Sequence, residues 1–200
     1  MAYMKKGYLS PMVLKITFWG DNWDEISIKP SVSGSPFSLA FDHLNPDLIY
    51  LGFEYLRDKR GIVFRSIDGG DTWTELPMNF NIKSDFSKIV VSPLISLSRK
   101  VNFVYISTFE GIFKSADTGE TWKRICSNRV TDFCLTESGC LIALLNNDLI
   151  CSEDDGKNWE TVYRYGMTDN PEFHQLYLDE NNKRIFIAGA KGLFTGSFNK

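Results

Sequence analysis

The sequence has little of what marks several large classes of protein. None of its apolar runs approaches the roughly 20 residues that a membrane-spanning helix needs. Its net charge is −3, from 22 basic and 25 acidic residues, so the chain as a whole has no attraction to nucleic acid or to an anionic membrane. We therefore expect no membrane span and no nucleic-acid partner.

Metal-binding patterns are also scarce. The chain has only two histidines, and no two of its four cysteines have the CxxC spacing. We therefore expect no structural zinc site, no other bound metal and no cofactor. Reduced, half-buried thiols are the expected state, although in an exported chain four cysteines could pair in three ways. The cysteines are Cys126, Cys134, Cys140 and Cys151.

Catalytic and export signatures are missing as well. Neither the GxSxG nucleophile motif nor the GxxxxGK[ST] phosphate loop occurs. Near the N-terminus, Pro11, Lys15 and Asp21 interrupt the apolar stretch that a secretory signal would need. We expect no signal peptide; the cytoplasm is the default compartment, and export stays an open alternative.

What the chain does contain is a repeated phrase. Its 200 residues include 43% hydrophobic and 14% aromatic residues, a composition that suits a β-rich core. The phrase Ser-x-Asp-x-Gly-x-Thr/Asn-Trp occurs at 66–73, 115–122 and 152–159. A weakened copy at 16–26 keeps Gly20 and Trp23, whereas Trp19 falls outside the repeat. Such recurrence predicts a repeat architecture.

Each phrase belongs to a longer unit of strand-like segments. Two alternating or apolar runs precede it, and a third run leads into it. The paired runs are 37–41 with 48–53, 88–92 with 102–107, 131–135 with 140–145, and 173–178 with 184–189. Adding a fourth strand that begins at the Trp gives four short antiparallel strands per unit, which is the blade of a β-propeller. We predict one all-β propeller domain over 1–200, or part of a propeller, with about four blades.

The phrase resembles the Asp-box, or BNR repeat, of sialidases, sortilin-like receptors, xyloglucanases and photosystem assembly factors. This resemblance covers nearly the whole chain and implies that the phrase is the hairpin between the third and fourth strands of a blade. Its residue types suit that hairpin, because Asp can accept turn N–H groups, Gly permits a positive φ, and Trp can be buried between blades. The predicted structural residues are Ser66, Asp68, Gly70, Thr72, Trp73, Ser115, Asp117, Gly119, Thr121, Trp122, Ser152, Asp154, Gly156, Asn158 and Trp159.

A catalytic role for the repeated aspartates is disfavoured. Paired carboxylates that hydrolyse a glycoside must face each other at roughly 5 to 10 Å. Hairpins on separate blades, as the resemblance places them, would not present Asp68, Asp117 and Asp154 in that way. The sequence thus names no catalytic residue.

The ends of the chain suggest how the propeller could close. The N-terminus supplies late strands of a blade, at 12–18 and 22–28, and the C-terminus stops after a third strand, at 192–198. An N-terminal strand could therefore complete the last blade and hide its edge. Two alternatives stay open: a homodimer whose halves join into eight blades, and a chain that is a piece of a longer protein.

Ligand-binding candidates lie in the turns between second and third strands and in the links between blades, which share one face of a propeller. Aromatic and Arg side chains there would make good binding anchors for a protein or a carbohydrate, while solvated charges and rim-covering tyrosines are the plainer interpretation. The candidates are Tyr55, Arg57, Lys59, Arg60, Arg129, Tyr163, Arg164 and Tyr165.

The resemblance also raises the hypothesis of a glycoside hydrolase. A sialidase would need three clustered arginines, a Tyr/Glu pair, an acid/base carboxyl group and an Arg-Ile-Pro motif, and that motif is absent. A xyloglucanase would use a cleft between two larger propellers. We therefore expect a non-catalytic binding or assembly module, with a glycosidase, whole or fragmentary, as the alternative.

Overall fold

The computed structural model describes most of the chain. The described residues are 2–3, 12–17, 22–28, 34–55, 60–78, 86–92, 102–164 and 172–197. Trp19 and three of the predicted binding residues, Arg57, Lys59 and Tyr165, lie outside them. In the part that is described, no helix has the length and apolar character to cross a membrane.

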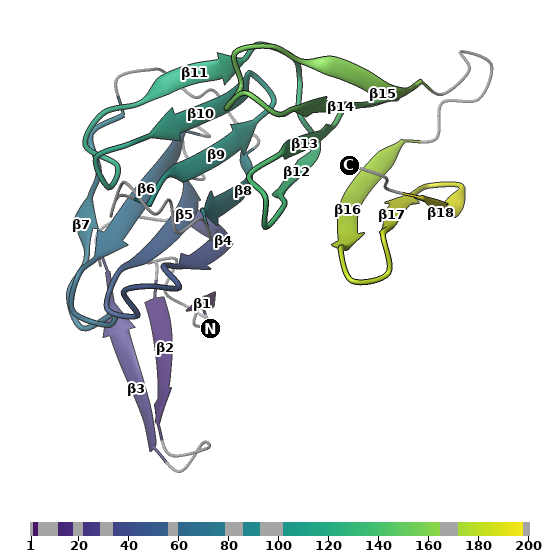
Figure 1. Ribbon diagram of the computed structural model, residues 1–200. Helices are drawn as coiled ribbons and strands as arrows, with labels where there is room; N and C mark the ends of the chain where they lie inside the picture. The colour runs from purple at the N-terminus through teal and green to yellow at the C-terminus, as the bar shows by residue number, and fades with distance from the viewer. Residues whose placement is uncertain are drawn as a thin grey trace.

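The structure confirms an all-β propeller built from consecutive antiparallel sheets (Figure 1). The first blade is β4 (Gly34–Phe41), β5 (Ile49–Tyr55), β6 (Gly61–Ser66) and β7 (Thr74–Glu75). The second is β8 (Phe86–Val91), β9 (Val104–Thr108), β10 (Gly111–Ser115) and β11 (Lys123–Cys126). The third is β12 (Asp132–Leu135), β13 (Leu141–Leu144), β14 (Asp148–Ser152) and β15 (Glu160–Arg164). The last blade is β16 (Phe173–Asp179), β17 (Arg184–Gly189) and β18 (Gly192–Ser197).

One expectation about closure is wrong for the described residues. The N-terminal strands β1 (Ala2–Tyr3), β2 (Met12–Thr17) and β3 (Asn22–Ser27) form a three-stranded sheet of their own. The segment that was expected to complete the last blade is therefore not paired with β18 there. Within the described residues, β2 has β1 on one edge and β3 on the other, so the N-terminal strands pair with one another rather than with β18.

Among the described residues, the hydrophobic core is divided into four clusters, each between two neighbouring sheets. Strand alternation explains the division, because successive side chains point to opposite faces of a blade. In β5, Tyr50 packs toward the second blade, whereas Leu51 and Phe53 pack toward the N-terminal sheet and Val13. Clusters of the same kind join the second blade to the third and the third to the last. A blade thus buries both faces only when it has a neighbour on each side.

The innermost strands are also tied to one another by polar contacts. The Ser38 hydroxyl of β4 accepts the N–H of Ile89 in β8 at 3.0 Å. In the same way, the Asp132 carboxylate of β12 accepts the N–H of Leu176 in β16 at 2.8 Å. The Lys88 ammonium of β8 forms an ion pair with the same Asp132 carboxylate at 3.1 Å. Figure 1 shows β4, β8, β12 and β16 as the inner strands of their sheets.

At the outer rim, the Gly of each repeated hairpin contacts a hydrophobic residue. A Cβ added to Gly119 would lie 2.4 Å from the Leu76 side chain, and one added to Gly156 would lie 2.7 Å from Cβ of Ile125. Leu76 and Ile125 occupy the same position of the repeat, three residues after the Trp of the preceding hairpin. The second and third hairpins are therefore seated on the blade that precedes each of them, whereas a Cβ added to Gly70 would meet only Ile49 and Trp73 of its own blade. We call this boundary between neighbouring blades a seam.

None of the four cysteines forms a disulfide in the structure. Cys126, Cys140 and Cys151 are buried and Cys134 is half-buried. Burial raises the pKa of Cys134 to about 12 and raises that of Cys126 as well. Both thiols therefore stay protonated near neutral pH, in the unreactive form.

The seating of the hairpin can be tested with two glycines. Gly156 and Gly192 both have positive φ, 82° and 123°, but an added Cβ meets Ile125 at Gly156 and open space at Gly192. Gly192→Ala should lower the free energy of unfolding by about 1–2 kcal/mol through backbone strain alone. Gly156→Ala should lower the free energy of unfolding by about 1–3 kcal/mol more than Gly192→Ala does, because overpacking against Ile125 adds to the strain. Urea denaturation measures both, and equal losses would show that the hairpin is not seated on the second blade.

Candidate functional site

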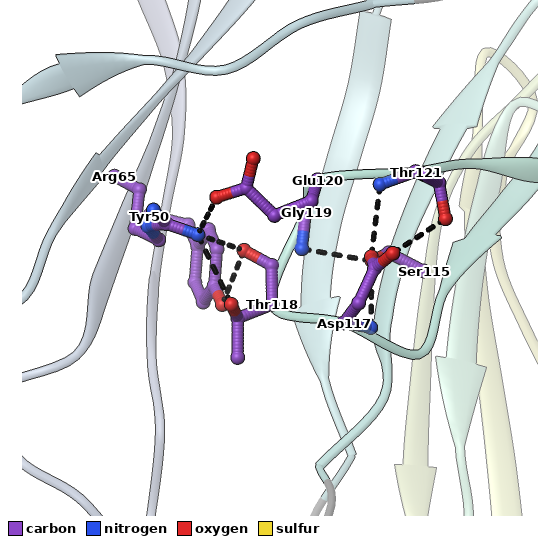
Figure 2. Close-up of polar contacts among 8 residues, drawn as sticks. All are labelled: Tyr50, Arg65, Ser115, Asp117, Thr118, Gly119, Glu120 and Thr121. Atoms are coloured by element: carbon purple, nitrogen blue, oxygen red, sulfur yellow. Dashed lines mark hydrogen bonds and ion pairs between the residues drawn. The ribbon is translucent and has the colours of Figure 1, made fainter.

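The three repeated hairpins share one pattern of hydrogen bonds, shown for the second in Figure 2. The Ser115 hydroxyl accepts the N–H of Gly119 at 2.8 Å and donates to Asp117 at 2.7 Å. One oxygen of Asp117 also accepts the N–H of Thr121 at 2.9 Å, and the other accepts the Thr121 hydroxyl at 2.5 Å. The hairpins at Asp68 and Asp154 repeat this pattern, with Asn158 using its amide in place of a hydroxyl.

These hydrogen bonds hold the hairpin carboxylates in the charged form. The side chain and then the backbone of Thr72 lower the pKa of Asp68 to about 2. The backbone N–H and then the amide of Asn158 lower that of Asp154 to about 2. Desolvation alone would raise the pKa of Asp117, but its hydrogen bonds from Thr121 and Ser115 outweigh it and the net shift is downward. An acid that must donate a proton near neutral pH needs the opposite shift.

The residue after each Asp adopts a left-handed conformation, which the sequence patterns did not reveal at this position. Gly69 has φ 69°, but the equivalent residues are Thr118 with φ 58° and Asp155 with φ 67°. A β-branched Thr is strained in this region. Figure 2 shows what holds it: the Thr118 carbonyl accepts from the Tyr50 hydroxyl at 3.2 Å and from the Arg65 guanidinium at 2.9 Å. Both donors come from the first blade, so the strained residue helps to form a seam.

The same pair of donors recurs at the next seam. Tyr105 of β9 and Lys114 of β10 are the counterparts of Tyr50 and Arg65, and both bind the Asp155 carboxylate of the third hairpin. Burial raises the pKa of Tyr50 and of Tyr105, so each phenol remains a hydrogen-bond donor. At the N-terminal sheet, Lys15 takes the equivalent position and pairs with Asp71 at 2.5 Å.

The signal for these contacts was present in the sequence. Lys15, Arg65 and Lys114 each immediately precede the first position of the phrase or its weakened copy. A second ion pair, from Arg65 to Glu120 at 2.8 Å, repeats the Lys15–Asp71 pairing at the equivalent hairpin position. In the third hairpin, Lys157 occupies the position of Asp71 and Glu120, and the acidic partner of Lys114 is Asp155, two residues earlier.

Two of the predicted binding residues meet in the turn between β5 and β6. The Arg60 guanidinium lies over the Tyr55 ring, 5.1 Å from its centroid, and the Tyr55 N–H donates to the Arg60 carbonyl at 2.9 Å. A second cation–π pair joins Arg129, in the link after β11, to Phe109 in the turn between β9 and β10, at 3.8 Å. Phe109 was not singled out from the sequence. Each pair presents an aromatic ring and a guanidinium together.

The remaining two described candidates lie at the end of β15. Arg164 Nε approaches Asp148 Oδ1 at 3.3 Å, and both side chains keep contact with solvent. Tyr163 is 50% exposed and borders a groove of about 360 Å³ between the third and last blades. Leu149, Val162, Phe173 and Phe194 also line this groove, which gives it a largely apolar wall.

The sequence-predicted residues therefore form local pairs rather than one cluster. Tyr55 and Arg60 belong to the first blade, whereas Arg129 borders the second and Arg164 belongs to the third. The described residues contain no group of three or more His, Cys, Asp or Glu side chains arranged to hold a metal.

No protein-family model matches the chain. Among curated proteins, a xyloglucanase from Paenibacillus sp. is 29% identical over 100 residues, which are 45% of this chain and 9% of that enzyme. Among solved structures, an ancestral GH74 enzyme aligns with a TM-score of 0.70 at 19% identity, over the whole of this chain and 31% of the other. YCF48 bound to a D1 peptide aligns with a TM-score of 0.60 at 14% identity, over 95% of this chain and 63% of the other.

These comparisons support a β-propeller fold, and the proteins that the chain resembles include a xyloglucanase, a GH74 enzyme and YCF48. The structural matches are below 25% identity and show the fold alone. The chain also spans less than a tenth of the xyloglucanase and about a third of the GH74 enzyme. Similarity to a part of an enzyme does not transfer its activity.

The hairpin carboxylates give a prediction about pH. Their pKa values are lowered in the folded protein, so their stabilising effect is complete above the unfolded-state pKa near 4 and is lost as the pH falls toward 2. The free energy of unfolding, measured by urea denaturation, should therefore fall between about pH 4 and pH 2. Asp154→Asn removes one titrating group and should make this fall shallower. An unchanged pH dependence in the variant would contradict the role assigned to Asp154.

Proposed function

We propose that the chain is a non-catalytic binding or assembly module. Its binding face is formed by the turns between second and third strands and by the links between blades. A protein partner fits this face best, because aromatic rings and guanidinium groups, the usual anchors of protein interfaces, stand there on successive blades. The observation that carries the proposal is the groove beside Tyr163, where an exposed aromatic ring borders a largely apolar wall.

The state of the hairpin aspartates supports the same proposal. Asp68, Asp117 and Asp154 are each committed to several hydrogen bonds within their own hairpin. Their lowered pKa values suit structural carboxylates rather than proton donors. We further propose that these hairpins are Asp boxes, since the Ser, Asp, Gly and Thr/Asn positions each have a distinct role in the turn.

The binding face can be tested by a matched pair of double variants. Tyr163→Ala with Arg129→Ala removes two exposed anchors from the proposed face. Leu44→Ala with Arg184→Ala removes an exposed apolar residue and an arginine from the turns between first and second strands, on the opposite face. The immobilised chain would be used to capture partners from an extract of its source cells, and the captured protein would then be purified for direct titration.

The first double variant should weaken binding by about tenfold or more, as truncation of interface anchors usually does. The second should bind the partner as the unaltered protein does. Equal weakening by both variants, or no effect of the first, would overturn the proposed face. Thermal unfolding of each variant controls for loss of the fold.

A second candidate function is that of a part of a xyloglucan-acting hydrolase. The 29% identity to a xyloglucanase over 100 residues favours it. Incubation of the purified chain with xyloglucan, followed by measurement of newly formed reducing ends, separates the two functions. Hydrolysis that is lost when an acidic residue is neutralised would replace the binding-module proposal with an enzymatic one.

A further inference from the structure

The seam between the second and third blades contains a cleft that neither function uses. Its volume is about 630 Å³, and it lies at the rim, between the second hairpin and the third. Four cationic side chains and a single carboxylate line it, together with apolar residues that include Trp122 and Ile125. The charged groups are Lys114, Lys123, Arg124, Asp155 and Lys157.

The carboxylate of the cleft is already neutralised. Asp155 accepts hydrogen bonds from Lys114 and from the Tyr105 hydroxyl. Lys114 is almost enclosed, with 11% of its side chain exposed, and its ammonium lies 3.4 Å from the centroid of the Phe103 ring. This ion pair therefore belongs to the seam itself. The other three cations give the cleft its positive charge.

Those three cations have no carboxylate partner among the described contacts. The Arg124 guanidinium donates to the main-chain carbonyls of Glu110, Cys126 and Ser127. Lys123 and Lys157 are exposed, and the described part of the chain provides neither with an ion pair or a side-chain hydrogen bond. A concentration of positive charge of this kind is unexpected in a chain whose net charge is −3.

The repeat shows that the fold does not require these charges. At the neighbouring seam, between the first and second blades, the residues equivalent to Lys123 and Arg124 are Thr74 and Glu75. The residue equivalent to Lys157 is Glu120, which pairs with Arg65. The same backbone therefore supports one seam with acidic groups and another whose cations have no carboxylate partner among the described contacts.

We propose that this cleft binds an acidic peptide segment of a partner protein. Lysine ammonium groups on flexible stems can pair with carboxylates at varied spacings. Trp122 is only 6% exposed, so the cleft has no open aromatic face on which a sugar ring could stack. Apolar contacts with Ile125 can accompany the charge contacts of a peptide. The proposal goes beyond the binding face described above, because the cleft is a separate surface at the rim.

The repeat also supplies the test. Lys123→Thr with Lys157→Glu gives this seam the side chains that the neighbouring seam carries, so the fold should tolerate them. Lys183→Asn with Lys191→Glu makes the same change of charge in the last blade, away from the cleft, and Asn tolerates the left-handed φ of 51° at position 183. The probe is fluorescein-labelled deca-glutamate, and its fluorescence anisotropy is titrated with each protein at low ionic strength. Thermal unfolding confirms that each protein is folded.

The unaltered protein should bind deca-glutamate, and added salt should weaken the complex because it screens exposed charges. The cleft variant should bind about tenfold more weakly, while the control variant should stay within about twofold of the unaltered protein. Lys157→Gln alone, at an exposed position, should give a smaller loss in the same direction.

Three outcomes would overturn the proposal. The first is no binding of deca-glutamate at low ionic strength. The second is equal weakening by the cleft and control variants, which would show an effect of total charge alone. The third is binding of heparin, a sulfated polysaccharide, without binding of deca-glutamate, which would assign the cleft to a different class of ligand. None of these outcomes depends on the face that carries Tyr163.

Discussion

The contact between each hairpin and the blade before it is the interaction on which the rest of the structure depends. A blade has two apolar faces, and it can bury both only by packing against neighbours. At the rim, the Ser and Asp of each hairpin satisfy the turn internally, and in the second and third hairpins Gly119 and Gly156 lie against Leu76 and Ile125 of the preceding blade. The hydrogen bonds from Ser38 and Asp132 do the same at the inner strands.

The repeated phrase was enough to predict the strands and the position of the hairpins, because an alternating pattern and a fixed turn sequence are local properties. Contacts between blades were harder to predict. Tyr50 and Arg65 occupy what look like ordinary core and surface positions of their strands, and their partner Thr118 is 68 and 53 residues away from them in the sequence. The left-handed φ of Thr118 was unforeseen for the same reason, since bonds from another blade hold it there.

The candidate site was predicted only in part. Residue type was enough to predict Tyr55, Arg60 and Arg129 as binding candidates. Phe109, whose ring lies beneath the Arg129 guanidinium, carries no turn signal that would distinguish it in the sequence. The groove beside Tyr163 depends on how the third and last blades meet, which a sequence pattern does not specify. The expected completion of the last blade by an N-terminal strand was wrong for the described residues, because the N-terminal strands pair with one another, and β1 in that sheet is a two-residue strand that no pattern marked.

The seams are built from the same parts but not from the same chemistry. At each of the first three seams, a cation from one sheet forms an ion pair with the hairpin of the next blade. The three cations are Lys15 of the N-terminal sheet, Arg65 of the first blade and Lys114 of the second. At the equivalent place in the third blade the residue is Cys151, and the counterpart of the two seam tyrosines is Ile142; both belong to the apolar cluster shared with the last blade. The earlier seams therefore respond to ionic strength, whereas this one relies mainly on apolar burial, which strengthens with moderate warming and weakens in the cold. The boundaries of the propeller thus share apolar burial but differ in their sensitivity to salt, so a rise in ionic strength weakens the earlier seams more than the last one.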